Sequence, residues 1–92
     1  MACVADRELY VKTRVTLERL LDYAFNLRHV VLAKGTTKTL KMIDNIYKDV
    51  VRLIEDLSAW DEDEEICYDE FYTKIRNYTK ALNYIEQKYR EK

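Results

Sequence analysis

The sequence predicts an all-α fold, an antiparallel up-down-up three-helix bundle built as a single domain over residues 1–92. Three segments repeat apolar residues at alternating steps of three and four, the spacing of one helix face. The chain has no proline and one glycine, whereas hairpins and sandwiches need a turn residue every few positions. We therefore expect helices at about residues 5–33, 37–58 and 65–90.

The first expected helix carries a wide apolar face. Its central line consists of Tyr10, Thr13, Leu17, Leu20, Ala24, Leu27 and Val31. The positions that flank this line are Leu9, Leu21, Phe25 and Leu32. Together they widen the apolar arc to roughly 160° at 100° per residue, so this helix should face two neighbouring helices.

The other two helices repeat the pattern. The line of the second consists of Leu40, Ile43, Tyr47, Val50, Ile54 and Leu57. The line of the third, which is the most regular, consists of Tyr68, Phe71, Ile75, Tyr78, Leu82, Ile85 and Tyr89. Each line is long enough to form one side of a shared core.

The connections have local causes. Gly35 enters the left-handed region at little cost, so we expect it to end the first helix in that conformation. Thr36 or Thr37 can cap the next helix, because a hydroxyl accepts hydrogen bonds from its free amides. The second break is Ser58–Glu65, where five successive acids suit the positive N-terminus of the third helix. Short connections of this kind favour antiparallel neighbours.

The charges are sorted along the chain although the net charge is −1. Residues 55–73 contain nine acids and no Lys or Arg, while the segments before and after them are basic. An up-down-up bundle would therefore be acidic at one end and basic at the other. The residues expected at the basic end are Arg28, His29, Lys34, Lys38, Lys41, Lys88, Arg90 and Lys92. The N-terminus of the second helix adds free amides there, which suit an anion.

Two cysteines, Cys3 and Cys67, allow two interpretations. The first four residues do not resemble a secretory signal, so we expect an intracellular protein whose cysteines are thiols. The alternative is a disulfide, since both cysteines fall near the acidic end of the expected bundle. Such a bond would close a long loop and add about 3–4 kcal/mol to the stability.

No residue pattern indicates catalysis, a metal site or a cofactor. His29, followed by Lys34 and Gly35, resembles the pattern of histidine phosphotransfer domains. The lysine follows by five residues instead of three, which puts it on a different helix face, so His29 is interpreted as a surface imidazole. Glu62 and Glu65 match a magnesium-binding pair, but no second helix supplies enough partners, and they are interpreted as solvated acids. We expect no enzyme.

Two sets of residues are candidates for partner binding. Val4, Val11 and Val15 lie within about 40° of one another and outside the apolar arc of the first helix, which indicates a partner surface. Of the eight tyrosines, five fall on core lines. Tyr84 lies off these lines, one turn from the basic C-terminal segment, and is the tyrosine best placed to stack on a base.

We expect a small non-enzymatic interaction or assembly protein, homodimeric through Val4, Val11 and Val15. The alternative is a sequence-nonspecific nucleic-acid-binding protein. Its phosphate or base contacts would be Arg28, Lys34, Lys38, Lys41, Tyr84, Lys88 and Arg90. No apolar run reaches the length of a membrane span, so the expected location is the cytoplasm, or the host cytoplasm for a viral protein. Abundant Lys, Glu, Ile and Tyr with little Gln and Ser resemble the composition of hyperthermophile proteins, which favours an archaeal or archaeal-virus origin.

Overall fold

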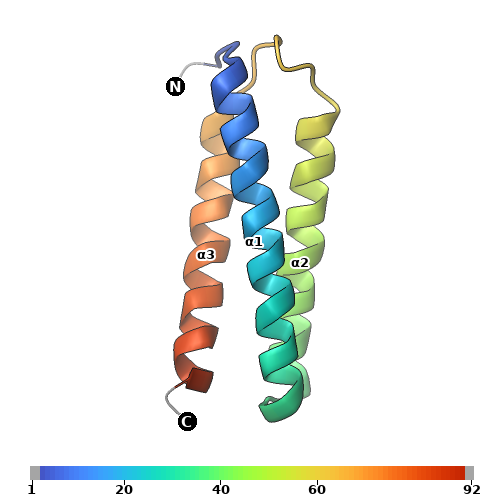
Figure 1. Cartoon of the computed structure of the whole chain (residues 1–92), viewed down its shortest axis with the longest axis vertical. Helices are drawn as coiled ribbons and strands as arrows, with labels where there is room; N and C mark the ends of the chain where they lie inside the picture. Colours follow the sequence, from blue (N-terminus) through green and yellow to red (C-terminus); the bar gives the residue numbers. More distant parts are fainter. Residues whose placement is uncertain (1–2, 91–92) are drawn as a thin grey trace.

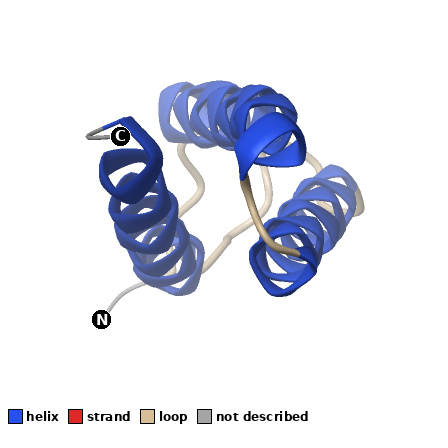
Figure 2. Ribbon diagram, turned by 90° about the horizontal axis from the view of Figure 1, so that it is seen from below, coloured by secondary structure: helices blue, strands red, loops and turns tan. Residues whose placement is uncertain are grey.

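The computed structural model describes residues 3–90, which form helices α1 (Arg7–Lys34), α2 (Thr37–Ser58) and α3 (Tyr68–Arg90). The helices run up, down and up in a rod of 45 × 20 × 17 Å (Figure 1). Viewed along the rod, α1 lies between the other two helices (Figure 2), and α2 and α3 contact each other much less than either contacts α1. The predicted antiparallel three-helix bundle is confirmed.

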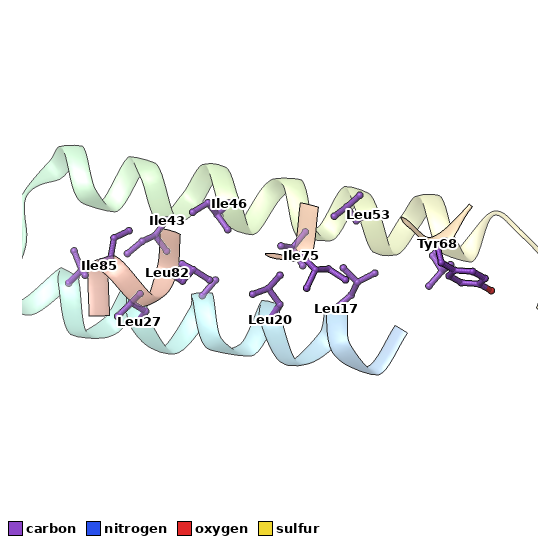
Figure 3. Close-up of a cluster of buried hydrophobic side chains, with 14 of the residues drawn as sticks. Leu17, Leu20, Leu27, Ile43, Ile46, Leu53, Tyr68, Ile75, Leu82 and Ile85 are labelled. Atoms are coloured by element: carbon purple, nitrogen blue, oxygen red, sulfur yellow. The ribbon is translucent and has the colours of Figure 1, made fainter. Parts of the chain in front are cut away.

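The line predicted for α1 forms its side of the core, whereas the core side of α2 is shifted from its predicted line: Ile46 and Leu53 are buried, and Leu40, Tyr47 and Ile54 are only partly buried. All seven central positions of α1 are buried, from Tyr10 to Val31. They pack against side chains of the other two helices that include Ile43, Ile46, Leu53, Ile75, Leu82 and Ile85 (Figure 3). Thr13 is the buried polar member, and its hydroxyl donates to the Leu9 carbonyl at 2.7 Å. A buried hydroxyl that is bonded in this way costs little stability.

Helix α1 begins two residues later than predicted. Asp6 is extended and caps the helix, since its carboxylate accepts a hydrogen bond from the Leu9 amide at 3.1 Å. The preceding Val4 pairs with Ile66 as an isolated antiparallel bridge, with backbone hydrogen bonds of 3.1 and 2.9 Å. The N-terminal segment is thus held by a distant part of the chain and does not extend the helix.

The turn between α1 and α2 corrects one expectation. Gly35 ends α1, but its φ of −102° is extended, so the predicted left-handed conformation is wrong. Space explains the glycine instead, because a Cβ here would collide with the Val31 side chain and lie 2.7 Å from the Val31 carbonyl oxygen. Thr36 then caps α2 by accepting from the Thr39 amide at 3.3 Å. It was one of the two predicted caps, and α2 has the predicted bounds.

The connection between α2 and α3 is longer than predicted, because α3 begins at Tyr68 and not at residue 65. Ile66 is occupied by its bridge to Val4, and Cys67 is bonded to Cys3. The five acids of residues 61–65 therefore lie in a loop, and Asp69 and Glu70 occupy the first turn of α3 in their place. The loop of residues 59–67, the N-terminal segment and the adjoining helix ends form what we call the acidic end.

The opposite end of the rod contains the Gly35 turn and the C-terminus of α3, and we call it the basic end. Figure 1 shows the two ends at the top and the bottom of the bundle. Cys3 and Cys67 meet at the acidic end with their Cα atoms 4.1 Å apart, and the structure joins them in a disulfide. The expectation of two thiols is therefore wrong, and the disulfide that the sequence allowed as the alternative is present.

Candidate functional site

The valines proposed as a partner surface do not form one group. Val11 and Val15 lie on the face of α1 that points away from α2 and α3, and both are exposed. Val4 is also exposed but precedes the helix and pairs with Ile66, so its assignment to the same helix face is wrong. The helical part of the surface therefore rests on Val11 and Val15.

This outer face continues along α1 beyond the valines that the spacing indicates. Phe25 and Leu32 were expected to flank the core, but they are 49% and 57% exposed. The two neighbouring helices cover the arc near the central line, where Leu9 and Leu21 are partly buried, and do not reach as far as Phe25 and Leu32. One exposed stripe with steps of four and three then contains Val11, Val15, Glu18, Asp22, Phe25, His29 and Leu32.

Local contacts order the polar members of this outer stripe. The His29 ring packs edge-on against Phe25 with ring centroids 4.8 Å apart, so the imidazole belongs to the apolar C-terminal half of the stripe. Glu18 forms an exposed ion pair with Arg14 at 3.5 Å, one turn earlier on α1. The stripe is therefore apolar at both ends and acidic in the middle.

The basic end brings together only some of the residues proposed to contact phosphate. Arg28 is already engaged, because its guanidinium donates to Asp44 at 2.8 Å. Four lysines at this end are exposed: Lys34, Lys38, Lys41 and Lys88. None of them forms an ion pair with a described residue. Tyr84 is 69% exposed and lies one turn before Lys88. The side chain of Arg90 and the whole of Lys92 lie outside the described residues.

The N-terminus of α2, proposed as an anion site, has internal partners. The Thr36 hydroxyl accepts from the Thr39 amide, and the Thr36 carbonyl accepts from the Leu40 amide at 3.1 Å. The Tyr89 hydroxyl of α3 donates to the Thr39 hydroxyl at 3.2 Å, which ties the last turn of α3 to this turn. Anion binding here stays a prediction.

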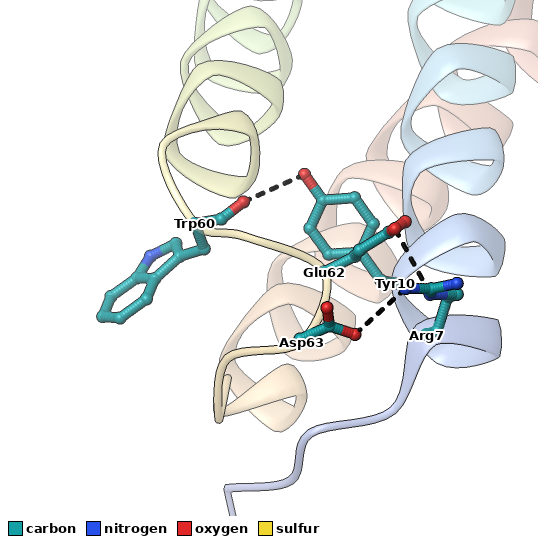
Figure 4. Close-up of polar contacts among 5 residues, drawn as sticks. All are labelled: Arg7, Tyr10, Trp60, Glu62 and Asp63. Carbon is teal, nitrogen blue, oxygen red and sulfur yellow. Dashed lines mark hydrogen bonds and ion pairs between the residues drawn. The ribbon is translucent and has the colours of Figure 1, made fainter.

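The loop at the acidic end is anchored by side chains of α1 (Figure 4). Arg7 forms ion pairs with Glu62 at 3.2 Å and with Asp63 at 3.3 Å. The buried Tyr10 hydroxyl reaches the carbonyl oxygens of Leu57 at 3.1 Å and Trp60 at 3.2 Å. Helix spacing does not predict this anchoring, because these contacts join residues about fifty positions apart.

Tyrosines of α3 contribute polar groups to the core. The Tyr78 hydroxyl donates to Asp49 at 3.1 Å, and burial followed by this hydrogen bond raises the pKa of Tyr78. The buried Tyr68 hydroxyl has no hydrogen-bond partner among the described residues. Burial, with smaller effects of Asp6, Tyr10 and Tyr72, raises the pKa of Tyr68. Tyr68 is buried and Tyr78 is partly buried, as their positions on the core line of the third helix predict.

Other kinds of site find little support. Within residues 3–90, no group of three or more His, Cys, Asp or Glu side chains is placed to hold a metal ion. None of the helices described here combines the length and apolar character that crossing a bilayer requires. Comparisons with family models, with curated proteins and with solved structures found no match to this chain.

Proposed function

We propose that this chain is a non-enzymatic assembly protein that forms a homodimer through the outer face of α1. The observation that carries this proposal is that α1 has two stripes with the same spacing. The inner stripe, from Tyr10 to Val31, is covered by side chains of α2 and α3. The outer stripe has the spacing of a coiled-coil seam and is exposed over its whole length. Apolar side chains aligned on a solvent face favour a partner helix.

The distribution of side chains along the outer stripe favours an antiparallel pair. In that arrangement Val11 and Val15 of one chain run alongside Phe25 and Leu32 of the other, so that small side chains face large ones. A parallel pair would place Glu18 against the partner's Glu18 and Asp22 against the partner's Asp22, whereas in the antiparallel pair only the two Asp22 side chains lie near each other. In the antiparallel pair, Arg14 and Arg19 of both chains flank the central carboxylates.

The charged ends of the bundle favour the same arrangement. An antiparallel dimer places the acidic end of each chain beside the basic end of its partner, whereas a parallel dimer places like ends together. The contact is isologous, so it closes after two copies. One helix per chain with four apolar anchors is a small interface, so we expect a reversible dimer that forms at high protein concentration.

Sedimentation equilibrium over a range of protein concentrations tests the dimer. We expect the double variant Val11→Glu and Val15→Glu to stay monomeric where the unmodified chain dimerises. A matched control changes Val30 and Met42 to Glu, because both are exposed to a similar degree and lie off the stripe. A monomeric unmodified chain at every concentration, or equal effects of the two variants, would contradict the proposal.

Salt tests the orientation. Since the antiparallel dimer is stabilised by facing opposite charges, its dissociation constant should rise with ionic strength. A dimer that strengthens with added salt would indicate a parallel pair and would overturn the argument from the charged ends.

Nucleic-acid binding is the second candidate. The observation that favours it is the set of exposed lysines at the basic end together with the exposed Tyr84. A gel shift at low salt with duplex and single-stranded DNA and RNA would detect such binding, which should weaken steeply with salt. The pairing of Arg28 with Asp44 removes one of the expected contacts, so we rank this function below assembly.

A further inference from the structure

A hollow of about 370 Å³ lies at the acidic end, on the side of the bundle where α2 and α3 face each other. Buried Leu53 and Ile66 contribute to its lining, and Trp60 and Phe71 add aromatic surface. This volume falls within the range of ligand-binding pockets. The outer stripe of α1 supplies none of the lining residues, so the hollow does not depend on the proposed dimer.

The backbone that carries Trp60 is fixed, although its side chain is not buried. The Trp60 carbonyl accepts from the buried Tyr10 hydroxyl, and its amide donates to the Leu57 carbonyl at 3.1 Å. The indole nevertheless points away from α1 (Figure 4) and the residue is 45% exposed. A large aromatic ring on an anchored backbone is therefore available to a partner at the edge of the hollow.

The other end of the loop is fixed as well. Ile66 is held by its bridge to Val4, and the next residue, Cys67, is held by the disulfide to Cys3. Both residues line the hollow. Because the wall is held at each end before any partner arrives, binding here would need little ordering of the chain.

The hollow carries a net negative charge. Asp56, Glu65 and Glu70 line it, and none of these carboxylates forms an ion pair with a described residue. The neighbouring Glu62 and Asp63 differ in this respect, because both pair with Arg7. Lys74 is the one basic residue in the lining.

We propose that this hollow binds a short basic segment of a partner protein, with Lys or Arg side chains next to an apolar residue. The cation would lie on the Trp60 indole, which attracts positive charge through its ring face, and would face the carboxylates of Glu65 and Glu70. The alkyl stem of the basic side chain and the neighbouring apolar residue would cover Leu53 and Phe71. An acidic segment would be repelled by these carboxylates, and a purely apolar segment would leave them without a cation.

Trp60 is the sole tryptophan of the chain, so its fluorescence reports on the hollow directly. The probe is the tetrapeptide acetyl-Lys-Leu-Arg-Lys-amide, titrated into the full chain with its disulfide intact. We expect a saturable change in emission that weakens as salt is added. The double variant Glu65→Gln and Glu70→Gln should weaken binding about fivefold, because two exposed charge pairs are lost.

A matched variant separates the hollow from the general field of the acidic end. Glu8→Gln with Glu55→Gln removes the same charge from the same end, but neither residue lines the hollow. We expect the probe to bind this variant nearly as tightly as the unmodified chain. Equal weakening in both double variants would overturn the proposal, and so would the absence of a saturable change.

Two further probes distinguish the source of the cation. The acidic peptide acetyl-Glu-Leu-Glu-Glu-amide should leave the emission of Trp60 unchanged. Spermidine has a similar charge but no apolar side chain, and should bind several-fold more weakly. Equally tight binding of spermidine would assign the hollow to free amines and overturn the peptide proposal. A concentration-dependent emission without any probe, lost in Glu65→Gln and Glu70→Gln, would overturn it in favour of the basic end of a second copy.

Discussion

The two ends of the bundle are closed in different ways. At the basic end, Gly35 and Thr36 alone connect two helices, and apart from the hydrogen bond of the Tyr89 hydroxyl to Thr39 the turn depends on contacts within four or five residues. At the acidic end, a loop of residues 59–67 is held by a disulfide, a backbone bridge, two ion pairs and a buried tyrosine. A short connection is thus specified locally, whereas a long charged one needs partners from distant parts of the chain.

Removing the disulfide should have the largest effect on this difference. The bond joins residues 64 positions apart, so its loss is expected to cost about 4 kcal/mol of unfolding free energy. Urea denaturation with and without a reducing agent measures this cost. The double variant Cys3→Ser and Cys67→Ser should match the reduced chain and should not respond to the reducing agent. An unchanged midpoint would show that the other contacts hold the loop by themselves.

Gly35→Ala tests whether the basic end depends on close packing. The new Cβ would meet the Val31 side chain and carbonyl oxygen, so we expect a loss of about 1–3 kcal/mol in thermal or urea unfolding. Lys34→Ala, at an exposed neighbouring position, should change the stability by less than about 0.5 kcal/mol. If Gly35→Ala were as harmless as that control, the argument from space would fail.

Tyr10→Phe tests the anchoring of the acidic loop without changing a charge. The variant leaves the carbonyl oxygens of Leu57 and Trp60 without their shared donor, which should cost about 1–2 kcal/mol. The emission of Trp60 should shift at the same time, because its backbone is released. Tyr84→Phe removes an exposed hydroxyl and serves as the control, with no change expected in either measurement.

Alkaline titration should show a smaller difference between the two ends, in the pKa of one tyrosine at each. Burial raises the pKa of Tyr68 at the acidic end above 10.0, whereas at the basic end the Thr39 hydroxyl, which donates to the phenolate when Tyr89 ionises, lowers the pKa of Tyr89. The folded chain therefore holds the Tyr68 proton more tightly than the unfolded chain does. The stability from Tyr68 is complete below pH 10 and is lost as the pH rises through the folded-state pKa. Because the folded-state pKa of Tyr89 is lowered, its contribution to the stability changes with pH in the opposite direction.

Side-chain NMR resolves the two tyrosines in this titration. The Tyr89 ring should ionise first and the Tyr68 ring last, and unfolding should follow the ionisation of Tyr68. The reverse order of ionisation would contradict the assigned environments.

Local pattern accounts for the features that the sequence predicted well. The buried line of α1 and the bounds of α2 depend on side chains three or four residues apart and on the cap supplied by Thr36, so they could be predicted from spacing. The separation of acidic and basic residues to opposite ends of the bundle follows from the same helices, because their directions alternate. Of the surface on α1, the spacing indicated Val11 and Val15 but placed Phe25 and Leu32 near the core.

Only the tertiary structure decided the rest. The late start of α3, the position of Val4 and the choice of a disulfide all follow from pairing between residues more than sixty positions apart, which no local periodicity encodes. The exposure of Phe25 and Leu32 depends on how far two neighbouring helices reach around α1. The hollow beside Trp60 exists because the loop is drawn across the helix ends, and helix spacing carries no information about that path.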